Sequence, residues 1–130
     1  MKVGNNIYAS NGMWNFGNNV ADSFVKHISL SVPFYKDGQE IICDLSEFFI
    51  KPNQIHYELG SSTGELTKML SERHSHKDNA LIVGIDSQLQ MIKKAEEYCL
   101  EAKSIRFDHA DLVDYKFEKS NFITSYYCIQ

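Results

Sequence analysis

The stretch that decides the fold is Ile55–Leu70, which reads IHYELGSSTGELTKML. Its first five residues could end a buried strand, whereas its last seven carry apolar residues at helical spacing. Between them lies Gly60-Ser61-Ser62-Thr63-Gly64, a run of small residues. Glycines permit backbone dihedrals and close approaches that a side chain would block. We therefore expect a strand, a tight loop and a helix. Either a ligand approaches the loop backbone, or the loop is a short structural connection.

The residues that follow alternate between strand and helix patterns. Residues 80–86, ALIVGID, form a continuous apolar run typical of a strand buried on both faces. A helix is expected over residues 91–102, followed by strands over 104–111 and 119–130. The inward side of that helix holds Met91, Ile92, Ala95 and Cys99. This order predicts an α/β fold, a Rossmann-like parallel sheet of four strands.

Two helices are expected before the first strand. One begins near Asn19 and ends at Val32-Pro33, and the second stops before Pro52. The inward face of the second helix is expected to carry its apolar residues, which are Ile41, Ile42, Leu45, Phe48 and Phe49.

The length and composition fit a single hydrophobic core. The chain has 130 residues, of which 43% are hydrophobic. Residues 1–18 are rich in Asn and Gly and show no clear period, so we expect an arm or loop that Trp14 and Phe16 anchor to the domain. The remaining residues, 19–130, are expected to form one domain.

Charge, cysteines and histidines narrow the function classes. A net charge of −4 creates no general attraction for a polyanion. No run of about 18 apolar residues is present and the start lacks a signal-peptide pattern, so we expect a soluble, cytoplasmic protein without a membrane partner. Cys43, Cys99 and Cys128 lack zinc-site spacing and are expected to be buried free thiols. His74 and His76 are best explained by a polar loop, so no metal is expected.

Acidic residues follow two of the expected strands, where ligands bind in open parallel sheets. Asp86 could accept two ribose hydroxyl groups of an adenosine cofactor, although Asp86 and Ser87 could equally cap the next helix. Asp111 could accept the amino group of an adenine and Leu112 could cover the ring. A polar turn with a buried leucine is the alternative.

The loop spacing argues against a phosphate ligand. It reads Gly-x-Ser-x-Gly, whereas the dinucleotide fingerprint is Gly-x-Gly-x-x-Gly. Glu65 follows in the first helical turn, where its carboxylate suits the helix dipole but opposes an anion. A zwitterionic or uncharged ligand is favoured, and a nicotinamide enzyme is disfavoured.

The sequence resembles class I S-adenosylmethionine-dependent methyltransferases in three features taken together. These are the glycine loop after one strand, the acidic residue after the next strand and the Asp after the third. The segments Ser31-Val32-Pro33-Phe34-Tyr35 and Glu58-Leu59-Gly60-Ser61-Ser62-Thr63-Gly64 resemble a narrower family. This is the family of carboxy-S-adenosylmethionine synthase, which makes the donor for uridine-5-oxyacetic acid in transfer RNA, and its methyltransferase relatives. The likeness covers residues 15–130 and only the N-terminal part of the family's seven-stranded fold.

The resemblance implies S-adenosylmethionine, or a close analogue, as the cofactor. Tyr35 would lie near its amino acid part, and Glu58 would hold the loop or the ammonium group. The implied cofactor-binding residues are Tyr35, Glu58, Gly60, Ser61, Ser62, Gly64, Asp86, Ser87, Met91, Asp111, Leu112 and Tyr127. No covalent nucleophile is required, because methyl transfer depends mainly on orientation. No catalytic residue is assigned.

The resemblance implies a small molecule or transfer RNA as the methyl acceptor. Adenine in DNA is excluded as the acceptor, because the last residues lack the Asn-Pro-Pro-Tyr or Asp-Pro-Pro-Tyr motif of enzymes that methylate its amino group. The last strand would be a sheet edge that exposes Phe122, Ile123, Tyr126 and Tyr127. A bare edge favours pairing, so we expect a homo-oligomer, a partner protein or the missing half of a longer gene product to cover it. The alternative function is a non-catalytic module that binds a protein through this edge.

Overall fold

The computed structural model describes residues 8–10, 13–15, 28 and 32–128. Its elements are, in order, β1 (Tyr8–Ser10), β2 (Met13–Asn15), α2 (Tyr35–Ser46), β3 (Ile55–Leu59), α3 (Glu65–Arg73), β4 (Leu81–Asp86), α4 (Leu89–Tyr98), β5 (Ile105–His109) and β6 (Ile123–Ser125). Most of the first expected helix lies outside the described residues. Within the expected arm, β1 and β2 pair in antiparallel orientation.

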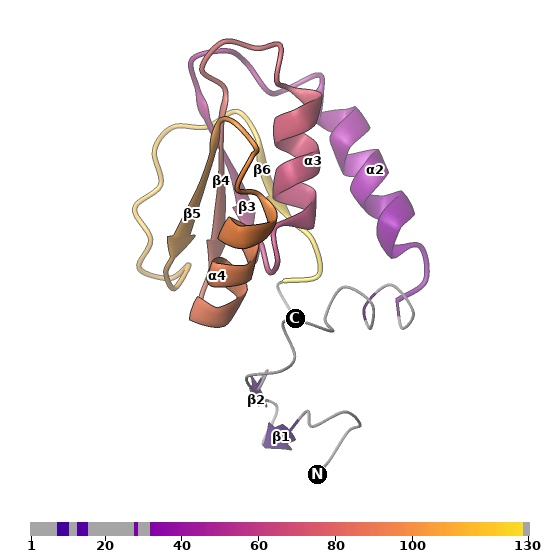
Figure 1. Cartoon of the computed structure of the whole chain (residues 1–130), viewed down its shortest axis with the longest axis vertical. Coiled ribbons are helices and arrows are strands. Elements are labelled where there is room, and N and C mark those ends of the chain that lie inside the picture. Colours follow the sequence, from indigo (N-terminus) through magenta and orange to yellow (C-terminus); the bar gives the residue numbers. More distant parts are fainter. Residues whose placement is uncertain (1–7, 11–12, 16–27, 29–31, 129–130) are drawn as a thin grey trace.

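The main sheet has four parallel strands in the order β5-β4-β3-β6 (Figure 1). This confirms the Rossmann-like α/β fold. The last strand is shorter than expected, because only Ile123–Ser125 pair with β3. The carboxyl ends of β3 and β4 come together, with Leu59 beside Ile85. The loop after β3 therefore starts next to the end of β4.

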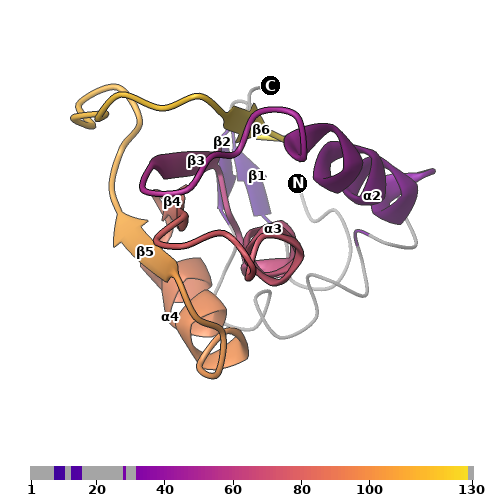
Figure 2. The same cartoon turned by 90° about the horizontal axis from the view of Figure 1, so that it is seen from above.

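The sheet is covered differently on its two faces. The helices α2, α3 and α4 lie on one side, and the segment joining β5 to β6 runs along the other (Figure 2). The helix side buries Cys43, Ile50, Leu66, Leu70, Ala80 and Ile82. On the other side Tyr57, Val83 and Ile85 pack against Leu112 and Tyr115. Because strand side chains alternate between faces, β4 is buried on both, as its apolar run indicates.

The helix α2 turns a different face inward from the one expected. Its buried residues are Tyr35, Gln39, Cys43 and Ser46. Four of the residues expected inside are largely exposed, namely Ile41 (58%), Leu45 (51%), Phe48 (74%) and Phe49 (49%). Only Ile42 of that set packs against the core. The expected helix is present but ends at Ser46, so Phe48 and Phe49 lie beyond it. α2 carries apolar residues on two faces, and the buried face is set by contacts with α3 and with Tyr126, which follows β6.

His74 belongs to the core and not to a polar loop. Its side chain is only 2% exposed, and its Nε2 lies 2.6 Å from the hydroxyl oxygen of Ser46. That hydroxyl donates to the carbonyl oxygen of Cys43 at 2.6 Å, so it accepts from His74 and links α3 to α2. Burial lowers the pKa of His74 to about 4. Among the described residues, no group of three or more His, Cys, Asp or Glu is placed to hold a metal ion.

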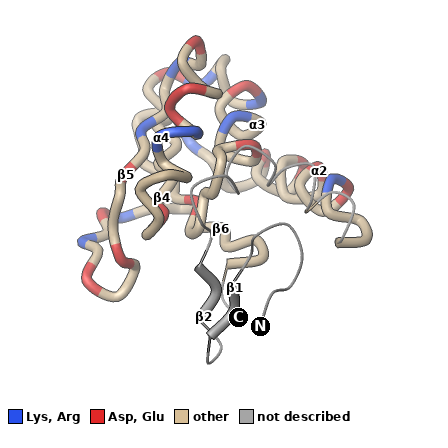
Figure 3. Tube along the Cα trace, turned by 60° about the horizontal axis from the view of Figure 1, so that its bottom comes forward, with Lys and Arg blue, Asp and Glu red and all other residues tan. Residues whose placement is uncertain are grey.

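Charged residues of both signs are interspersed over the described chain (Figure 3). The guanidinium of Arg73 lies 2.9 Å from a carboxylate oxygen of Asp44, and the ammonium of Lys77 lies 3.2 Å from Glu47. These two cations are thus compensated by carboxylates of α2 and of its C-terminal end. Within the described ranges, none of the helices combines the length and apolar character needed to cross a bilayer.

Candidate functional site

The loop at residues 60–64 leaves the carboxyl end of β3 and leads into α3. Gly60 and Gly64 have φ angles of 73° and 82°, and Ser62 has a φ angle of 50°. Glycine adopts these left-handed conformations without steric cost. The N–H groups of Gly60 and Ser61 donate to the carbonyl oxygen of Ile85 at 2.8 and 2.9 Å. The loop therefore folds over the end of β4, which confirms the expected strand, loop and helix.

A side chain at either glycine would collide with a neighbour. A Cβ atom at Gly64 would lie 2.9 Å from the ring of Phe107 and 3.0 Å from the Cβ of Ala95. Gly64 thus lets α3 start close to β5 and α4. A Cβ atom at Gly60 would collide with the sulfur of Cys128. Gly60 therefore presents its bare Cα to the segment that follows β6.

Asp86 at the end of β4 holds the loop from the side. One carboxylate oxygen accepts the N–H of Ser62 at 2.9 Å, and the other accepts the N–H of Gln88 at 2.8 Å. Burial raises the pKa of Asp86, and these two hydrogen bonds oppose the increase. The carboxylate therefore fixes both the glycine loop and the start of α4.

Glu58 lies at the base of the loop and is 4% exposed. The hydroxyl of Thr67, on the facing side of α3, donates to its carboxylate. Burial raises the pKa of Glu58 to about 8, and the negative charge of Asp86 adds to the increase, whereas the Thr67 hydrogen bond opposes it. At neutral pH this carboxyl group is therefore protonated in most molecules.

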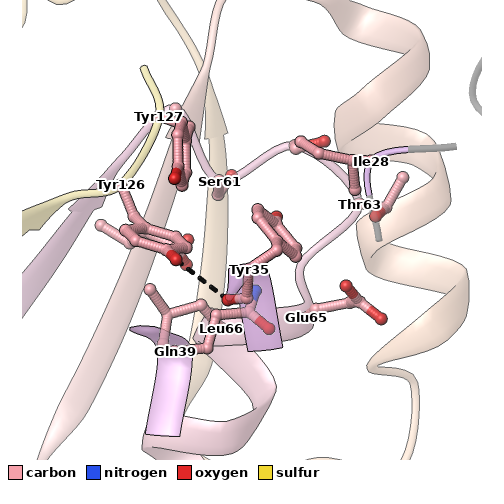
Figure 4. A pocket seen from close by; sticks show the side chains of 12 residues that line it. Ile28, Tyr35, Gln39, Ser61, Thr63, Glu65, Leu66, Tyr126 and Tyr127 are labelled. Atoms are coloured by element: carbon pink, nitrogen blue, oxygen red, sulfur yellow. Dashed lines mark hydrogen bonds between the residues drawn. The ribbon is translucent and has the colours of Figure 1, made fainter. Parts of the chain in front are cut away.

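A small pocket, partly open to solvent, lies in front of the loop (Figure 4). Three tyrosines from α2 and from the residues after β6 gather there. The ring centroid of Tyr35 lies 5.4 Å from that of Tyr126 and 5.8 Å from that of Tyr127. The Tyr126 hydroxyl donates to the carbonyl oxygen of Tyr35 at 2.9 Å. The pocket is lined by Ile28, Tyr35, Gln39, Glu58, Gly60, Ser61, Ser62, Thr63, Glu65, Leu66, Tyr126 and Tyr127.

A sequence profile described as a methyltransferase domain matches residues 57–130. The chain belongs to this methyltransferase domain family. It is 35% identical over 118 residues to the carboxy-S-adenosyl-L-methionine synthase of Staphylococcus epidermidis, covering 90% of this chain and 50% of that protein. For the synthase of the same name from Sulfurimonas denitrificans, identity is 33% over 120 residues, with 88% and 48% covered. The chain spans about half the length of these curated relatives. The family resemblance drawn from the sequence is confirmed.

Solved structures show the same fold. An RNA methyltransferase from Salinibacter ruber, in complex with S-adenosyl-L-homocysteine, matches with a TM-score of 0.55 and 24% identity over 72% of this chain and 60% of that one. A SAM-dependent methyltransferase from Aquifex aeolicus matches with a TM-score of 0.57 and 21% identity over 78% and 55%. The fold of this methyltransferase domain is therefore shared with these enzymes.

The predicted binding residues of the methyltransferase domain divide into two groups. Those that line the pocket are Tyr35, Glu58, Gly60, Ser61, Ser62 and Tyr127. Those outside its lining are Gly64, Asp86, Ser87, Met91, Asp111 and Leu112. Ser62 connects the groups, because its N–H bonds to Asp86 and its hydroxyl lies 3.7 Å from the sulfur of Met91. Asp111 is exposed and accepts the N–H of Val113 at 2.9 Å, whereas Leu112 packs on the sheet face opposite the helices.

Several pocket residues of the methyltransferase domain were not predicted from sequence. These are Ile28, Gln39, Thr63, Glu65, Leu66 and Tyr126. Glu65 and Leu66 follow the glycine loop directly. Gln39 lies four residues after Tyr35, which places both on one face of α2. The helical spacing of four residues, counted from the predicted Tyr35, is the sequence signal that identifies Gln39.

Proposed function

We propose that this methyltransferase domain binds S-adenosylmethionine in the pocket in front of residues 60–64 and belongs to an enzyme that methylates a small molecule or a transfer RNA. The observation that carries this proposal is the glycine loop, which leaves β3 at its carboxyl end and is held by Asp86 from β4. Ligands bind at this place in open parallel sheets. The names of the relatives and of the structural neighbours support the same cofactor. Family membership favours this function over a non-catalytic binding module.

The residues present fit such a cofactor. Ser61 is 3% exposed, and its hydroxyl has no hydrogen-bond partner among the described residues although it lines the pocket. A ligand could complete this hydroxyl's hydrogen bonding, because it can both donate and accept. Bound S-adenosylmethionine supplies a methyl group on a sulfonium centre. The contribution of the chain is to bind and orient it, with Glu58 positioned at the base of the loop and Asp86 keeping the loop in place.

We also propose that β6 pairs with a further strand, which is supplied by a second copy of this chain, by a different protein, or by the missing half of a longer gene product. This strand is at one end of the described sheet order, and Ile123 is 51% exposed. An unpaired strand edge offers free N–H and C=O groups to a second strand.

The free thiols of Cys43, Cys99 and Cys128 suit the reducing cytoplasm, which we propose as the location.

Light scattering at rising concentration tests the pairing of β6. We expect a molar mass above that of a single chain, and a decrease toward the monomer in Ile123→Lys, because a charge on an edge strand opposes edge-to-edge pairing. Lys119→Glu, an exposed charge change before β6, is the control. A monomer mass at every concentration would rule out the second copy as the partner.

Calorimetric titration with S-adenosylmethionine tests the cofactor. We expect saturable binding to the unmodified chain. Asp86→Asn should bind the cofactor at least about tenfold more weakly than the unmodified chain, since hydrogen bonds to a charged group contribute about 1.5–3 kcal/mol. Asn keeps the size of the side chain but loses one acceptor oxygen and the charge.

The control for this titration is Asp114→Asn, the same change at an exposed position between β5 and β6. It should bind like the unmodified chain. Circular dichroism of every sample confirms that the domain is folded. A folded, unmodified chain that produces no binding heat and no thermal shift with S-adenosylmethionine would disprove the proposed function.

A further inference from the structure

The helix α3 starts at a residue that has no side chain to cap it. Gly64 is the residue before the first turn, and no side-chain hydrogen bond is made from it. The N–H of Lys68 donates to the carbonyl oxygen of Gly64 at 2.9 Å, so the N–H groups of residues 65–67 precede the first intrahelical bond. A serine or aspartate at position 64 would collide with Phe107. A cap for α3 therefore has to come from another element.

Glu58 of β3 provides this cap. Its carboxyl group accepts the hydroxyl of Thr67, the third residue of α3, and is also hydrogen-bonded to the backbone of Thr67. The third N–H of a helix is a usual target of a capping side chain, and a carboxylate there suits the helix dipole. Thr67 is fully buried and Glu58 is 4% exposed, so little water competes for the contact. Thr67 thus fixes the carboxyl group through its side chain and its backbone.

The same carboxyl group borders the pocket. Glu58 lines it beside Gly60 and Ser61, and no Lys or Arg is found among the described lining residues. Burial raises the pKa of Glu58 to about 8, and both hydrogen bonds from Thr67 oppose the increase. Hydrogen bonds to the charged form of a group favour that form. Thr67 therefore makes it easier for Glu58 to become charged when a positive ligand group binds.

We propose that Thr67 is a positioning residue for cofactor binding, which acts by holding the Glu58 carboxylate toward the ammonium group of the ligand. The inference rests on the proposed function. When the ammonium group binds, Glu58 loses its proton to solvent, and the Thr67 hydroxyl stabilises the carboxylate that forms. S-adenosylmethionine and S-adenosylhomocysteine carry the same ammonium group, so Thr67 contributes equally to the affinity for both.

Other titratable groups surround Glu58. The negative charge of Asp86 on β4 opposes its ionisation, and Glu65 lines the same pocket. Further described groups in electrostatic contact with Glu58 are Tyr35, Cys43, Cys99 and Cys128. Burial raises the pKa of each of these four, so they stay largely neutral up to about pH 8.5. All these groups are the same in the variants below, so their contributions cancel when affinities are compared at one pH.

Calorimetric titration of Thr67→Val and Thr67→Ser with each ligand tests the proposal. Valine keeps the branched shape but lacks the hydroxyl, which serine retains. At pH 6 we expect Thr67→Val to bind both ligands about tenfold more weakly than the unmodified chain, and Thr67→Ser to bind nearly as tightly. Ser71→Ala is the control, because it removes another buried hydroxyl of α3, one that donates to the carbonyl oxygen of Lys103. It should bind both ligands normally.

The pH profile separates positioning from a structural role. At pH 8.5 Glu58 is charged in most molecules before the ligand binds, so the hydroxyl stabilises the free and the bound domain alike. The loss in Thr67→Val should then decrease to about threefold. The amino group of the ligand titrates equally in all samples and cancels in this ratio. In a Glu58→Gln background, Thr67→Val should cause little further loss, because the two residues act as one unit.

Circular dichroism confirms that each variant is folded, and Thr67→Ala replaces Thr67→Val if valine prevents folding. A loss that is equal at both pH values, or that serine does not restore, would overturn the role of Thr67, because a general effect on packing would explain it. Unchanged affinity in the folded Thr67→Val would also overturn it. These outcomes leave cofactor binding standing. Failure of the folded, unmodified chain to bind either ligand would overturn the proposed function itself.

Discussion

Gly64→Val is expected to destabilise the domain by about 2 to 5 kcal/mol, enough to leave a marginal fold largely unfolded. The backbone at Gly64 has a φ of 82°, and a left-handed conformation costs roughly 1–2 kcal/mol for a residue with a Cβ. The new Cβ would lie 2.9 Å from Phe107 and 3.0 Å from Ala95, and forcing extra carbon atoms into a packed site typically costs about 1–3 kcal/mol more. Urea denaturation measures the change.

Gly38→Ala is the matched control. A Cβ at Gly38 would collide with the hydroxyl oxygen of Tyr126, so the far end of this side chain must move and its hydrogen bond to Tyr35 is disturbed, but no positive φ is involved. Alanine also has a helix propensity about 1 kcal/mol better than glycine, which offsets a local shift of the tyrosine. We expect a change within about 1 kcal/mol. If Gly64→Val proved as stable as this control, the stability of the domain would not depend on the close approach of α3 to β5 and α4.

The second large effect is that the stability of the domain depends on pH through Glu58. This carboxyl group is fully buried, and its pKa is raised to about 8 in the folded state from a usual value of 4.5. Between these values the folded state binds more protons than the unfolded state, so stability decreases as pH rises from 4.5 through 8. The slope reaches about 1.4 kcal/mol per pH unit in the middle of this range. Glu58→Gln, which stays neutral, should reduce this dependence, and the raised pKa values of Asp86 and Glu65 contribute the remainder.

Urea denaturation between pH 5 and pH 9 tests this expectation, with Glu101→Gln as the exposed control that should keep it. His74 acts in the opposite direction. Its pKa is lowered to about 4, so its contribution to stability is lost as pH falls from 6.5 toward 4. The acid-side loss should therefore persist in Glu58→Gln. An unchanged decline between pH 6 and pH 8 in that variant would show that another group causes it.

Much of the fold follows from local pattern. The apolar run of β4, the small residues at 60–64 and the helical spacing of Leu66 and Leu70 each lead to the element that the structure contains. These signals are reliable because a strand buried on both faces needs apolar residues without alternation, and a tight left-handed turn needs glycine. The family resemblance rests on the same residues.

The orientation of α2 does not follow from pattern. Its sequence has one apolar stripe through Ile41 and Leu45 and a second face through Tyr35, Gln39 and Cys43, and periodicity fits both. The buried face is the one that reaches the residues after β6, where the Tyr126 hydroxyl donates to the carbonyl oxygen of Tyr35. His74 was likewise placed in a polar loop because its partner, Ser46, lies 28 residues away.

The sequence by itself determined the parallel α/β fold, the glycine loop and the acidic residue at the end of β4, because each depends on neighbours within a few residues. The tertiary structure alone decided which side chains meet in the pocket. Tyr35 and Tyr126 are 91 residues apart and meet only because α2 packs beside the strand at the sheet edge. The burial that raises the pKa of Glu58 has the same origin, since desolvation arises from the sum of packing by distant segments.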